Sequence, residues 1–170
     1  FDLGAACSGF VYSLEMARSW VLSQQKPALI VGCELLSRIV DWQDRETCVL
    51  FGDGAGAAVL VPSEENGIPF SYLAADGENF NLLKIDSGCR ISRSGPERQL
   101  GYLQMLGKPV FNFAVRSLEN VINIILQKNN LTIDDITYIV PHQANLRILE
   151  LVAKRMEIPS QKFYNNINEV

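Results

Sequence analysis

The sequence lacks the features that mark secreted, membrane-spanning and metal-binding proteins. No apolar run approaches the roughly 20 residues needed to span a bilayer, and the first residues lack the basic and then apolar pattern of a signal peptide. The four cysteines form no Cys-x-x-Cys pair, and the single histidine is far from all of them in sequence. Neither a zinc site nor a disulfide framework is indicated. We therefore expect a cytoplasmic protein that makes no membrane contact.

Positive charge is also scarce, because 15 Lys and Arg residues face 19 Asp and Glu residues. The resulting net charge of −4 argues against nucleic-acid binding, although a local basic patch could still bind an acidic partner. By contrast, 48% of the residues are hydrophobic, which is typical of a globular protein with a buried core. The chain opens on Phe1 without a methionine and stops at Val170 without a tail, so we expect it to be part of a longer protein.

Hydrophobic periodicity predicts a helix and two strands in the first part of the chain. Apolar residues recur at helical spacing between Cys7 and about Gln24. Residues 28–32 form a short, nearly all-apolar run of the kind found in strands that are buried on both faces. A second such run, residues 57–61, follows a glycine-rich bend that begins at Gly52.

A second set of elements follows a region rich in glycine, proline, serine and charge. We expect helices from about Val110 to Lys128 and from Asn145 to Met156, with a strand at residues 136–140 between them. Helices that alternate with strands predict an α/β architecture with mostly parallel or mixed sheets. Weaker strand patterns cover residues 1–3, 70–75 and 162–167. The predicted parts are residues 1–62, a connecting region 63–108, and residues 109–170.

The glycine run at residues 52–56 has two interpretations. A dinucleotide-binding loop places its glycines between a strand and a helix. Here the glycines enter a β-branched apolar run that ends at Pro62. We therefore favour close approach of the backbone at a packed turn over a nucleotide site.

Cys7 is the first candidate for chemistry. It follows a corner of small residues, Gly4-Ala5-Ala6, and precedes the predicted helix. The positive end of a helix dipole stabilises an anion, and so it favours the thiolate, which is the nucleophilic form of cysteine. The small neighbours leave room for a thioester to approach the sulfur. A buried structural cysteine is the alternative.

His142 is the only histidine, so any imidazole chemistry in these residues must use it. It follows a predicted strand, on the kind of loop where open α/β sheets bind ligands. A lone histidine can equally be a satisfied surface or core residue, but its combination with Cys7 favours a catalytic pair. For Cys33, Cys48 and Cys89 we expect packing or simple exposure, with Cys33 at the end of a buried strand.

Four motifs considered together are more specific than any of these residues alone. They are Ala-Ala-Cys-Ser-Gly-Phe at 5–10, Asp-Trp-Gln-Asp-Arg at 41–45, Phe-Gly-Asp-Gly-Ala-Gly-Ala at 51–57, and Val-Pro-His-Gln-Ala-Asn-Leu-Arg at 140–147. In this order they resemble motifs of β-ketoacyl-acyl-carrier-protein synthase III, a thiolase-fold condensing enzyme. The resemblance implies a layered α/β/α/β/α fold of two similar halves, usually as a homodimer. This chain would be an internal fragment that spans parts of both halves.

The resemblance also implies a reaction. An acyl group, often acetyl, moves from acyl-coenzyme A to the cysteine, and malonyl-acyl-carrier protein is then decarboxylated to give the carbanion that attacks the acyl-enzyme. Cys7 would be the nucleophile, with its backbone N–H in the oxyanion hole, and His142 would stabilise the enolate. Coenzyme A thioester is then a substrate, and neither a metal nor a separate cofactor is expected.

Further site residues come from the same resemblance. Arg45 would stack near the coenzyme A adenine, while Gly107 and Asn145 would line the pantetheine channel. The alternatives are a solvated arginine, a turn glycine and a helix N-cap. The family's third catalytic residue is the Asn of a Gly-Asn-Thr-Ser segment, which is missing from the sequence. The asparagines at 165–168 do not match it, so we expect this residue beyond the last one given.

The helix predicted after His142 offers a site for a partner. At about 100° per residue its cations and its apolar residues separate onto two sides. The cations are Arg147, Lys154 and Arg155, and the apolar residues are Ile148, Leu149, Val152 and Met156. The cations would attract an acidic carrier protein. A merely solvated helix face is the alternative.

Three functions remain open at this point. The first is a synthase III-type acyltransferase, and the second is a related thiolase-fold polyketide or secondary-metabolite synthase with another primer. The third is a non-catalytic subunit that binds a carrier protein, although the presence of both Cys7 and His142 argues against it. We also expect the 170 residues on their own to be inactive and prone to aggregate, because apolar segments such as 28–31 and 59–61 would lack neighbours.

Overall fold

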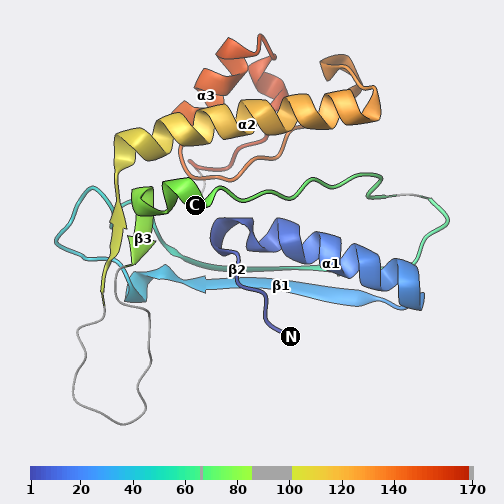
Figure 1. Cartoon of the computed structure of the whole chain (residues 1–170), viewed down its shortest axis with the longest axis horizontal. Helices are drawn as coiled ribbons and strands as arrows, with labels where there is room; N and C mark the ends of the chain where they lie inside the picture. Colours follow the sequence, from blue (N-terminus) through green and yellow to red (C-terminus); the bar gives the residue numbers. More distant parts are fainter. Residues whose placement is uncertain (66, 86–100, 169–170) are drawn as a thin grey trace. The chain divides into compact units, whose positions relative to one another are not determined.

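The computed structural model describes residues 1–65, 67–85 and 101–168, which form two compact units. One unit comprises Phe1–Pro69 and Leu73–Leu106, and the other comprises Phe70–Tyr72 and Gly107–Val170. The first unit holds α1 (Gly9–Gln24), β1 (Ala28–Leu35), β2 (Asp53–Leu60), β3 (Leu83–Ile85) and β4 (Leu103–Met105). The second holds α2 (Gly107–Asn129) and α3 (Leu146–Arg155), as Figure 1 shows.

In the first unit, α1 covers one face of a two-stranded antiparallel ladder made of β1 and β2 (Figure 1). Ile30 lies on this face and is only 5% exposed. A Cβ atom added to Gly32 would lie 3.8 Å from the ring of Phe10, an ordinary van der Waals contact, so the packing of the helix on the strand does not require a glycine here. The helix buries Ala17 and Val21, two of the residues that predicted it.

The expected mostly parallel or mixed sheets are not formed in the described residues, where both ladders, β1–β2 and β3–β4, are antiparallel. Parallel pairing between neighbouring strands needs a crossover, usually a helix. Residues 36–52, between β1 and β2, contain a short 3-10 helix, Leu36–Arg38, and turns but no α-helix, so the chain reverses direction there. Among residues 1–65, 67–85 and 101–168, parallel pairing is limited to a single bridge between Ile139 and Phe163.

The second face of the β1–β2 ladder is open. Leu29 and Val31 are 67% and 61% exposed, and Val59, opposite Leu29, is 63% exposed. The expectation that residues 28–32 are buried on both faces is therefore wrong, because helix α1 covers one face only. Cys33 shares the open face and is exposed, so it does not end a buried strand either. Exposed apolar patches on a sheet favour association with other chains.

We expect the substitutions Leu29→Lys and Val59→Glu, made together, to reduce self-association of the 170-residue chain. The two side chains face one another across the ladder, so opposite charges there preserve the pairing while removing apolar surface. Size-exclusion chromatography should show a shift from large species toward smaller ones. Ile30→Lys, on the covered face, is the control and should unfold the ladder. A wild-type chain that already elutes as a monomer would contradict the prediction.

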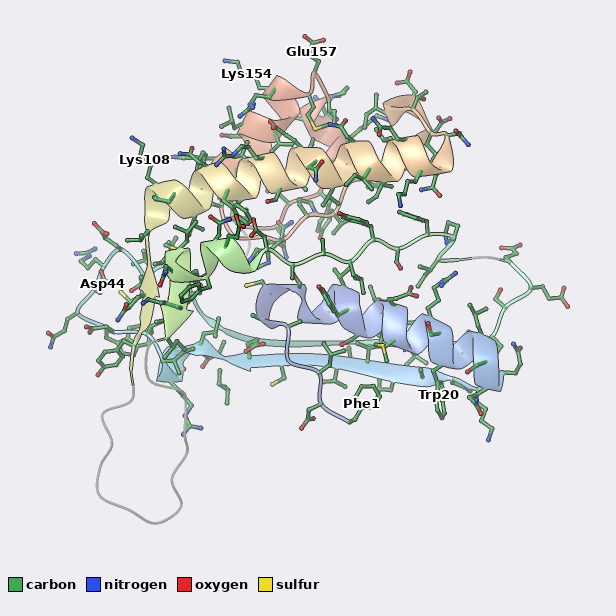
Figure 2. The ribbon with its side chains drawn as sticks, viewed as in Figure 1. Phe1, Trp20, Asp44, Lys108, Lys154 and Glu157 are labelled. Atoms are coloured by element: carbon green, nitrogen blue, oxygen red, sulfur yellow. The ribbon has the colours of Figure 1, made fainter. Side chains whose placement is uncertain are left out.

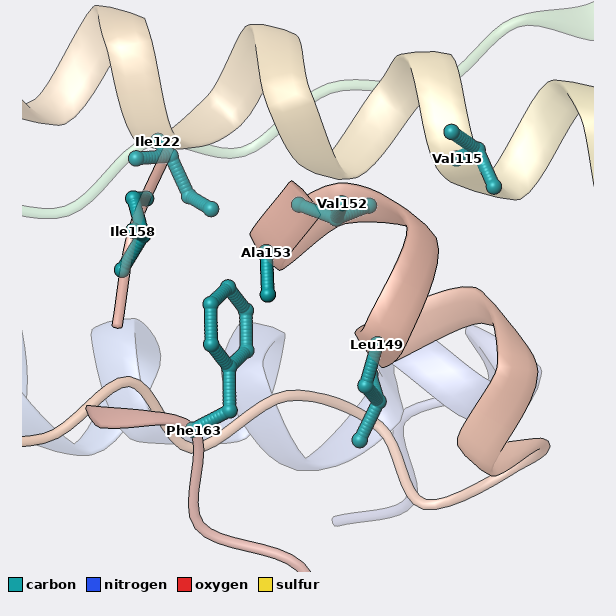
Figure 3. Packing of buried hydrophobic residues seen from close by; sticks show 7 residues of the cluster. All are labelled: Val115, Ile122, Leu149, Val152, Ala153, Ile158 and Phe163. Carbon is teal, nitrogen blue, oxygen red and sulfur yellow. The ribbon is translucent and has the colours of Figure 1, made fainter. Parts of the chain in front are cut away.

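The second unit is built on the amphipathic faces of α2 and α3, as predicted. Figure 3 shows Val152 of α3 facing α2 and the side chain of Ala153 pointing toward the ring of Phe163. The buried cluster consists of Val115, Ile122, Leu149, Val152, Ala153, Ile158 and Phe163. Helical spacing predicts Ile125 at the end of the apolar stripe of α2, but the partly buried Leu126 packs against the cluster there instead. Both positions lie one turn beyond Ile122, so periodicity alone did not separate them.

The strand predicted at residues 136–140 is reduced to one bridge. Ile139 donates its N–H to the Lys162 carbonyl at 2.7 Å and accepts the N–H of Tyr164 at 2.9 Å. The carbonyl of Ile136 instead accepts a hydrogen bond from the Lys162 ammonium. This side-chain contact replaces a ladder partner. The weaker patterns at 1–3 and 70–75 form no strand, and 162–167 contributes only the bridge at Phe163.

Gly52 immediately precedes β2, and Gly54 and Gly56 lie within it, so the glycine run does not connect a strand to a helix and does not fit a dinucleotide-binding loop. The expected close approach is also absent, because a Cβ atom added at Gly52, Gly54 or Gly56 would meet nothing within 4 Å. In the described residues, no helix has the combined length and apolar character needed to cross a bilayer.

Candidate active site

Cys7 lies in a 3-10 turn, Ala6–Ser8, directly before the first residue of α1. Its thiol is free and exposed, so it is not the buried structural cysteine considered above. Ala6, immediately before it, has a φ of 44° in the left-handed region. This conformation costs a non-glycine residue about 1–2 kcal/mol, and such strain is concentrated at functional sites. The turn thus presents the sulfur at the positive end of a 16-residue helix.

His142 lies on the exposed loop between the Ile139 bridge and α3. Although the side chain is accessible, surrounding atoms displace part of its hydration, and this desolvation lowers the pKa of the imidazole below the ordinary value of 6.5. The ring is therefore neutral at pH 7 and carries one N–H donor. Within the part of the chain that the structure describes, no side-chain hydrogen bond to this ring is found.

Gln143, next to His142, fixes this loop to a distant part of the chain. Its Nε2 donates to the carbonyls of Pro141 at 2.8 Å and Tyr164 at 3.2 Å. Its Oε1 accepts the N–H of Asn166 at 3.0 Å. The asparagine-rich end of the chain therefore lies beside the histidine loop. Sequence reasoning did not find this role, and the only available signal was the position of Gln143 directly after the histidine.

Arg45 lies in the turn-rich segment between β1 and β2, where Asp44 organises the neighbouring backbone (Figure 2). The Asp44 carboxylate accepts hydrogen bonds from Thr47 Oγ1 at 2.7 Å and from the N–H of Glu46 at 3.0 Å. These bonds, with that from Thr47 the larger cause, lower the pKa of Asp44. Thr47 is only 1% exposed, so the turn is anchored while Arg45 stays accessible.

A second carboxylate, that of Asp53, joins the two ends of the segment between β1 and β2. Asp53, the first residue of β2, accepts hydrogen bonds from the N–H of Ser37 at 2.8 Å and from its Oγ at 2.6 Å. The hydroxyl and then the backbone bond lower the pKa of Asp53. The Ser37 carbonyl in turn accepts from Trp42 Nε1 at 3.3 Å. Part of the glycine-rich motif therefore serves to shape the loop that carries Arg45.

The other predicted substrate-binding residues lie in the second unit. Gly107 is the exposed first residue of α2. Asn145 caps α3, with its Oδ1 accepting the N–H of Arg147 at 3.0 Å. The capping alternative for Asn145 is thus confirmed, and its place in a pantetheine channel stays a prediction. Cys7 and Arg45 belong to the first unit, whereas His142 and Asn145 share one loop of the second.

The cations of α3 are exposed as predicted, and Lys154 projects away from the helix into solvent (Figure 2). Arg155 differs from the other two, because its Nε lies 2.8 Å from Oε1 of Glu119 on α2. These two atoms are close enough to form an ion pair, but the geometry of the contact is not that of a hydrogen bond. Arg155 also borders a hollow of about 240 Å³ together with Asn112, Val115, Arg116 and Leu151. Arg116 was not predicted, because its proximity to Arg155 depends on how α2 and α3 pack.

An exposed thiol at a helix start and a neutral histidine on a loop are features of a thiolase-like condensing enzyme. Residues 1–77 match the family model of 3-oxoacyl-[acyl-carrier-protein] synthase III, and residues 126–170 match the model of its C-terminal part. The chain belongs to this family, which is also called β-ketoacyl-acyl-carrier-protein synthase III. The resemblance inferred from the four motifs is thereby confirmed, as is the fold class.

Individual relatives agree with this assignment. The chain is 46% identical to the β-ketoacyl-[acyl-carrier-protein] synthase III of Clostridium novyi (strain NT), over 99% of this chain and 53% of that protein. The crystal structure of the synthase III from Aquifex aeolicus VF5 has a TM-score of 0.86 and 42% identity, over 98% of this chain and 51% of that one. A priming β-ketosynthase from the R1128 polyketide pathway has a TM-score of 0.86 and 36% identity, over 99% and 50%. The chain thus spans about half the length of its relatives.

Proposed function

We propose that the protein containing this chain starts fatty-acid synthesis by condensing an acyl group from acyl-coenzyme A, acetyl in the simplest case, with malonyl-acyl-carrier protein. The observation that carries the proposal is the free, exposed thiol of Cys7 at the start of α1, in a chain that belongs to the synthase III family. A metal and a separate cofactor have no part in this proposal, since coenzyme A enters as a thioester substrate. The enzyme would act in the cytoplasm as a homodimer.

In the first step, Cys7 acquires the acyl group. The thiolate attacks the carbonyl carbon of the thioester, the carbon–sulfur bond to coenzyme A breaks, and coenzyme A leaves as its thiol after taking up a proton. Negative charge accumulates on the carbonyl oxygen in the transition state. Backbone N–H groups at the start of α1 have no carbonyl partners within the helix and are suited to stabilise this oxygen.

In the second step, His142 acts on malonyl-carrier protein. The bond between the carboxylate and the α-carbon breaks, carbon dioxide leaves, and its electron pair stays as an enolate of the thioester. The neutral imidazole suits this step because its N–H can donate to the enolate oxygen. The carbanion form then attacks the acyl carbon, and Cys7 leaves as a thiolate. The β-ketoacyl group remains on the carrier protein.

Substrate contacts away from the reacting atoms are assigned to three residues. Arg45 would stack on the adenine of coenzyme A, and its exposed position on the anchored turn suits this role. Gly107 and Asn145 would line the channel for the pantetheine arm. Such remote contacts contribute to catalysis by holding the thioester carbonyl in a geometry from which reaction occurs.

Incubation of the full-length protein with radiolabelled acetyl-coenzyme A tests the proposal. We expect acid-stable label on a single peptide that contains Cys7, and release of the label as a β-ketoacyl product when malonyl-carrier protein is added. Label that appears only with longer or aromatic acyl donors would instead support the related synthase with another primer. The similarity to a polyketide priming β-ketosynthase favours that function as the second candidate. No label with any donor would support a non-catalytic subunit.

The exposed cations of α3 are proposed to bind the acidic carrier protein. Changing both Arg147 and Lys154 to Glu should raise the KM for malonyl-carrier protein about tenfold or more at low salt, because two attractive contacts become repulsive. Acylation of Cys7 from coenzyme A should stay nearly unchanged. Arg155 is left intact, since its contact with Glu119 would complicate the result.

The matched control is Lys26→Glu, a reversal of an exposed cation in the other unit. It should leave the KM for malonyl-carrier protein within about twofold of the wild-type value, because an isolated surface charge has only a small effect. Measurements at two salt concentrations should show the difference between the variants shrinking as screening increases. An unchanged KM in the double variant at low salt would identify the face as merely solvated.

A further inference from the structure

The side chain of Gln143 makes three hydrogen bonds, and all of them are to backbone groups. The amide nitrogen donates to the carbonyls of Pro141 and Tyr164, and the amide oxygen accepts the N–H of Asn166. Tyr164 and Asn166 are 21 and 23 residues further along the chain. One side chain therefore connects both sides of His142 to a segment that is distant in sequence.

The bonds of Gln143 extend the parallel pairing at Ile139 beyond the point where backbone groups alone can form it. The Ile139 carbonyl accepts the N–H of Tyr164, and beyond this bridge the ladder stops. Pro141 has no N–H to donate, so the carbonyl of Tyr164 needs another donor. Gln143 supplies that donor, and its oxygen satisfies the N–H of Asn166. The amide thus replaces the next rung of the ladder at the point where the histidine loop leaves it.

The histidine depends on this arrangement, because its imidazole has no hydrogen bond of its own in the described chain. On the carboxyl side, the loop is fixed by Asn145 as the cap of α3. On the amino side, Gln143 provides the side-chain bonds that secure the backbone at Pro141. A peptide held on both sides has few orientations available to the side chain it carries, and catalytic rates are sensitive to displacements of about 1 Å.

We propose that Gln143 is a positioning residue for His142: by pairing with Pro141, Tyr164 and Asn166 it holds the loop in the geometry that decarboxylation of the malonyl group requires. The inference rests on the function proposed above. It adds a residue that touches neither substrate nor reacting atoms, and it assigns the effect of that residue to the second half-reaction alone.

The substitution Gln143→Glu isolates the two donated hydrogen bonds. Glutamate has nearly the same size and keeps an oxygen for the N–H of Asn166. Its second oxygen, however, would replace the Nε2 donor that faces the carbonyls of Pro141 and Tyr164. The contact between this oxygen and the carbonyl oxygens is repulsive. Gln143→Met removes all three bonds at similar volume without adding charge, so it serves as a second variant should the glutamate protein fail to fold.

The experiment measures both half-reactions of the full-length protein separately. In the Gln143→Glu and Gln143→Met variants we expect malonyl-carrier protein decarboxylation to fall by about tenfold to a hundredfold, with acetyl transfer to Cys7 within about twofold of wild type. The structural control is Lys162→Met, which removes two side-chain bonds to carbonyls, those of Ile133 and Ile136, in the same unit. This control should lower the thermal midpoint but leave decarboxylation close to the wild-type rate.

The other outcomes separate this inference from the proposed function. A wild-type protein that catalyses neither half-reaction would overturn both. An active wild type whose Gln143 variants decarboxylate at the same rate would overturn the positioning role alone. Equal losses in the two half-reactions, or a loss of decarboxylation in Lys162→Met as large as in the Gln143 variants, would also overturn it, because each would indicate general loosening of the unit.

Discussion

Replacing Cys7 with alanine in the full-length protein is expected to abolish acyl transfer from coenzyme A and to lower condensation at least about a thousandfold, since a nucleophile that acts as part of a unit cannot be replaced by the remaining groups. Stability should change little, because the thiol is exposed and pairs with no other cysteine in the described chain. The measurement is retention of radiolabel from acetyl-coenzyme A together with the rate of product formation. Thermal unfolding of the same variant checks that the fold is intact.

Alkylation supplies the control for this prediction. Cys33 is as clearly exposed as Cys7, and Cys48 is half-buried. Iodoacetamide at neutral pH should nevertheless modify Cys7 first, because among the described cysteines Cys7 alone lies in an exposed turn directly before a helix. Cys33, in the middle of an exposed strand face, is therefore the matched comparison within the same molecule. Faster modification of Cys33, Cys48 or Cys89, the last of which lies outside the described residues, would contradict the assignment of Cys7 as the nucleophile.

The helices were predictable because each carries a one-sided apolar pattern. In α2 and α3 most of the residues chosen by a period of about 3.6 meet in the core, and each predicted boundary lies within a few residues of the observed one. In α3 the same pattern also put Arg147 and Lys154 on the exposed side. The hydrophobic pattern predicts burial correctly here because the residues that cover each apolar helix face belong to the same chain.

The strands were less predictable because their burial depends on what covers them. An all-apolar run such as residues 28–32 indicates a strand but does not say how many of its faces are covered. In the structure, α1 covers the face that carries Ile30 and leaves Leu29 and Val31 exposed. At residues 136–140 the pairing is limited to the Ile139 bridge, and the Ile136 carbonyl accepts a hydrogen bond from the Lys162 side chain instead of a backbone N–H. Neither effect is visible in local composition.

The residues of the candidate site also differ in how readily the sequence identifies them. Cys7 and His142 could be identified from sequence because their types, neighbours and order in the chain carry the signal. Gln143 could not, because its role consists of contacts with residues more than twenty positions away. Arg116 was also missed, since it borders the hollow beside Arg155 only through the packing of α2 against α3. Sequence reasoning thus finds reactive groups more readily than the groups that hold them in place.

The neutral state of His142 sets the pH range in which its proposed role should operate. Desolvation lowers the pKa of the imidazole below 6.5, so the folded protein binds a proton at lower pH than the unfolded chain does. Any stabilisation associated with the neutral ring is therefore present above pH 6.5 and is lost as the pH falls through the lowered pKa. We expect decarboxylation by the wild-type enzyme to keep more than half of its histidine-dependent rate as the pH falls from 8 to 6.5, because a pKa below 6.5 leaves most of the imidazole neutral there.

Replacing His142 with alanine is accordingly expected to separate the two half-reactions. Decarboxylation of malonyl-carrier protein should fall by about a hundredfold to a thousandfold, the usual effect of removing one donor to a developing oxyanion. Transfer of the acyl group to Cys7 should change far less, because the oxyanion of that step is assigned to backbone N–H groups at the start of α1. His142→Gln is the matched variant, since it keeps an N–H donor that does not titrate and should recover part of the decarboxylation rate. An equal loss in both half-reactions would contradict the division of labour, and would place His142 in the activation of Cys7 instead of the stabilisation of the enolate.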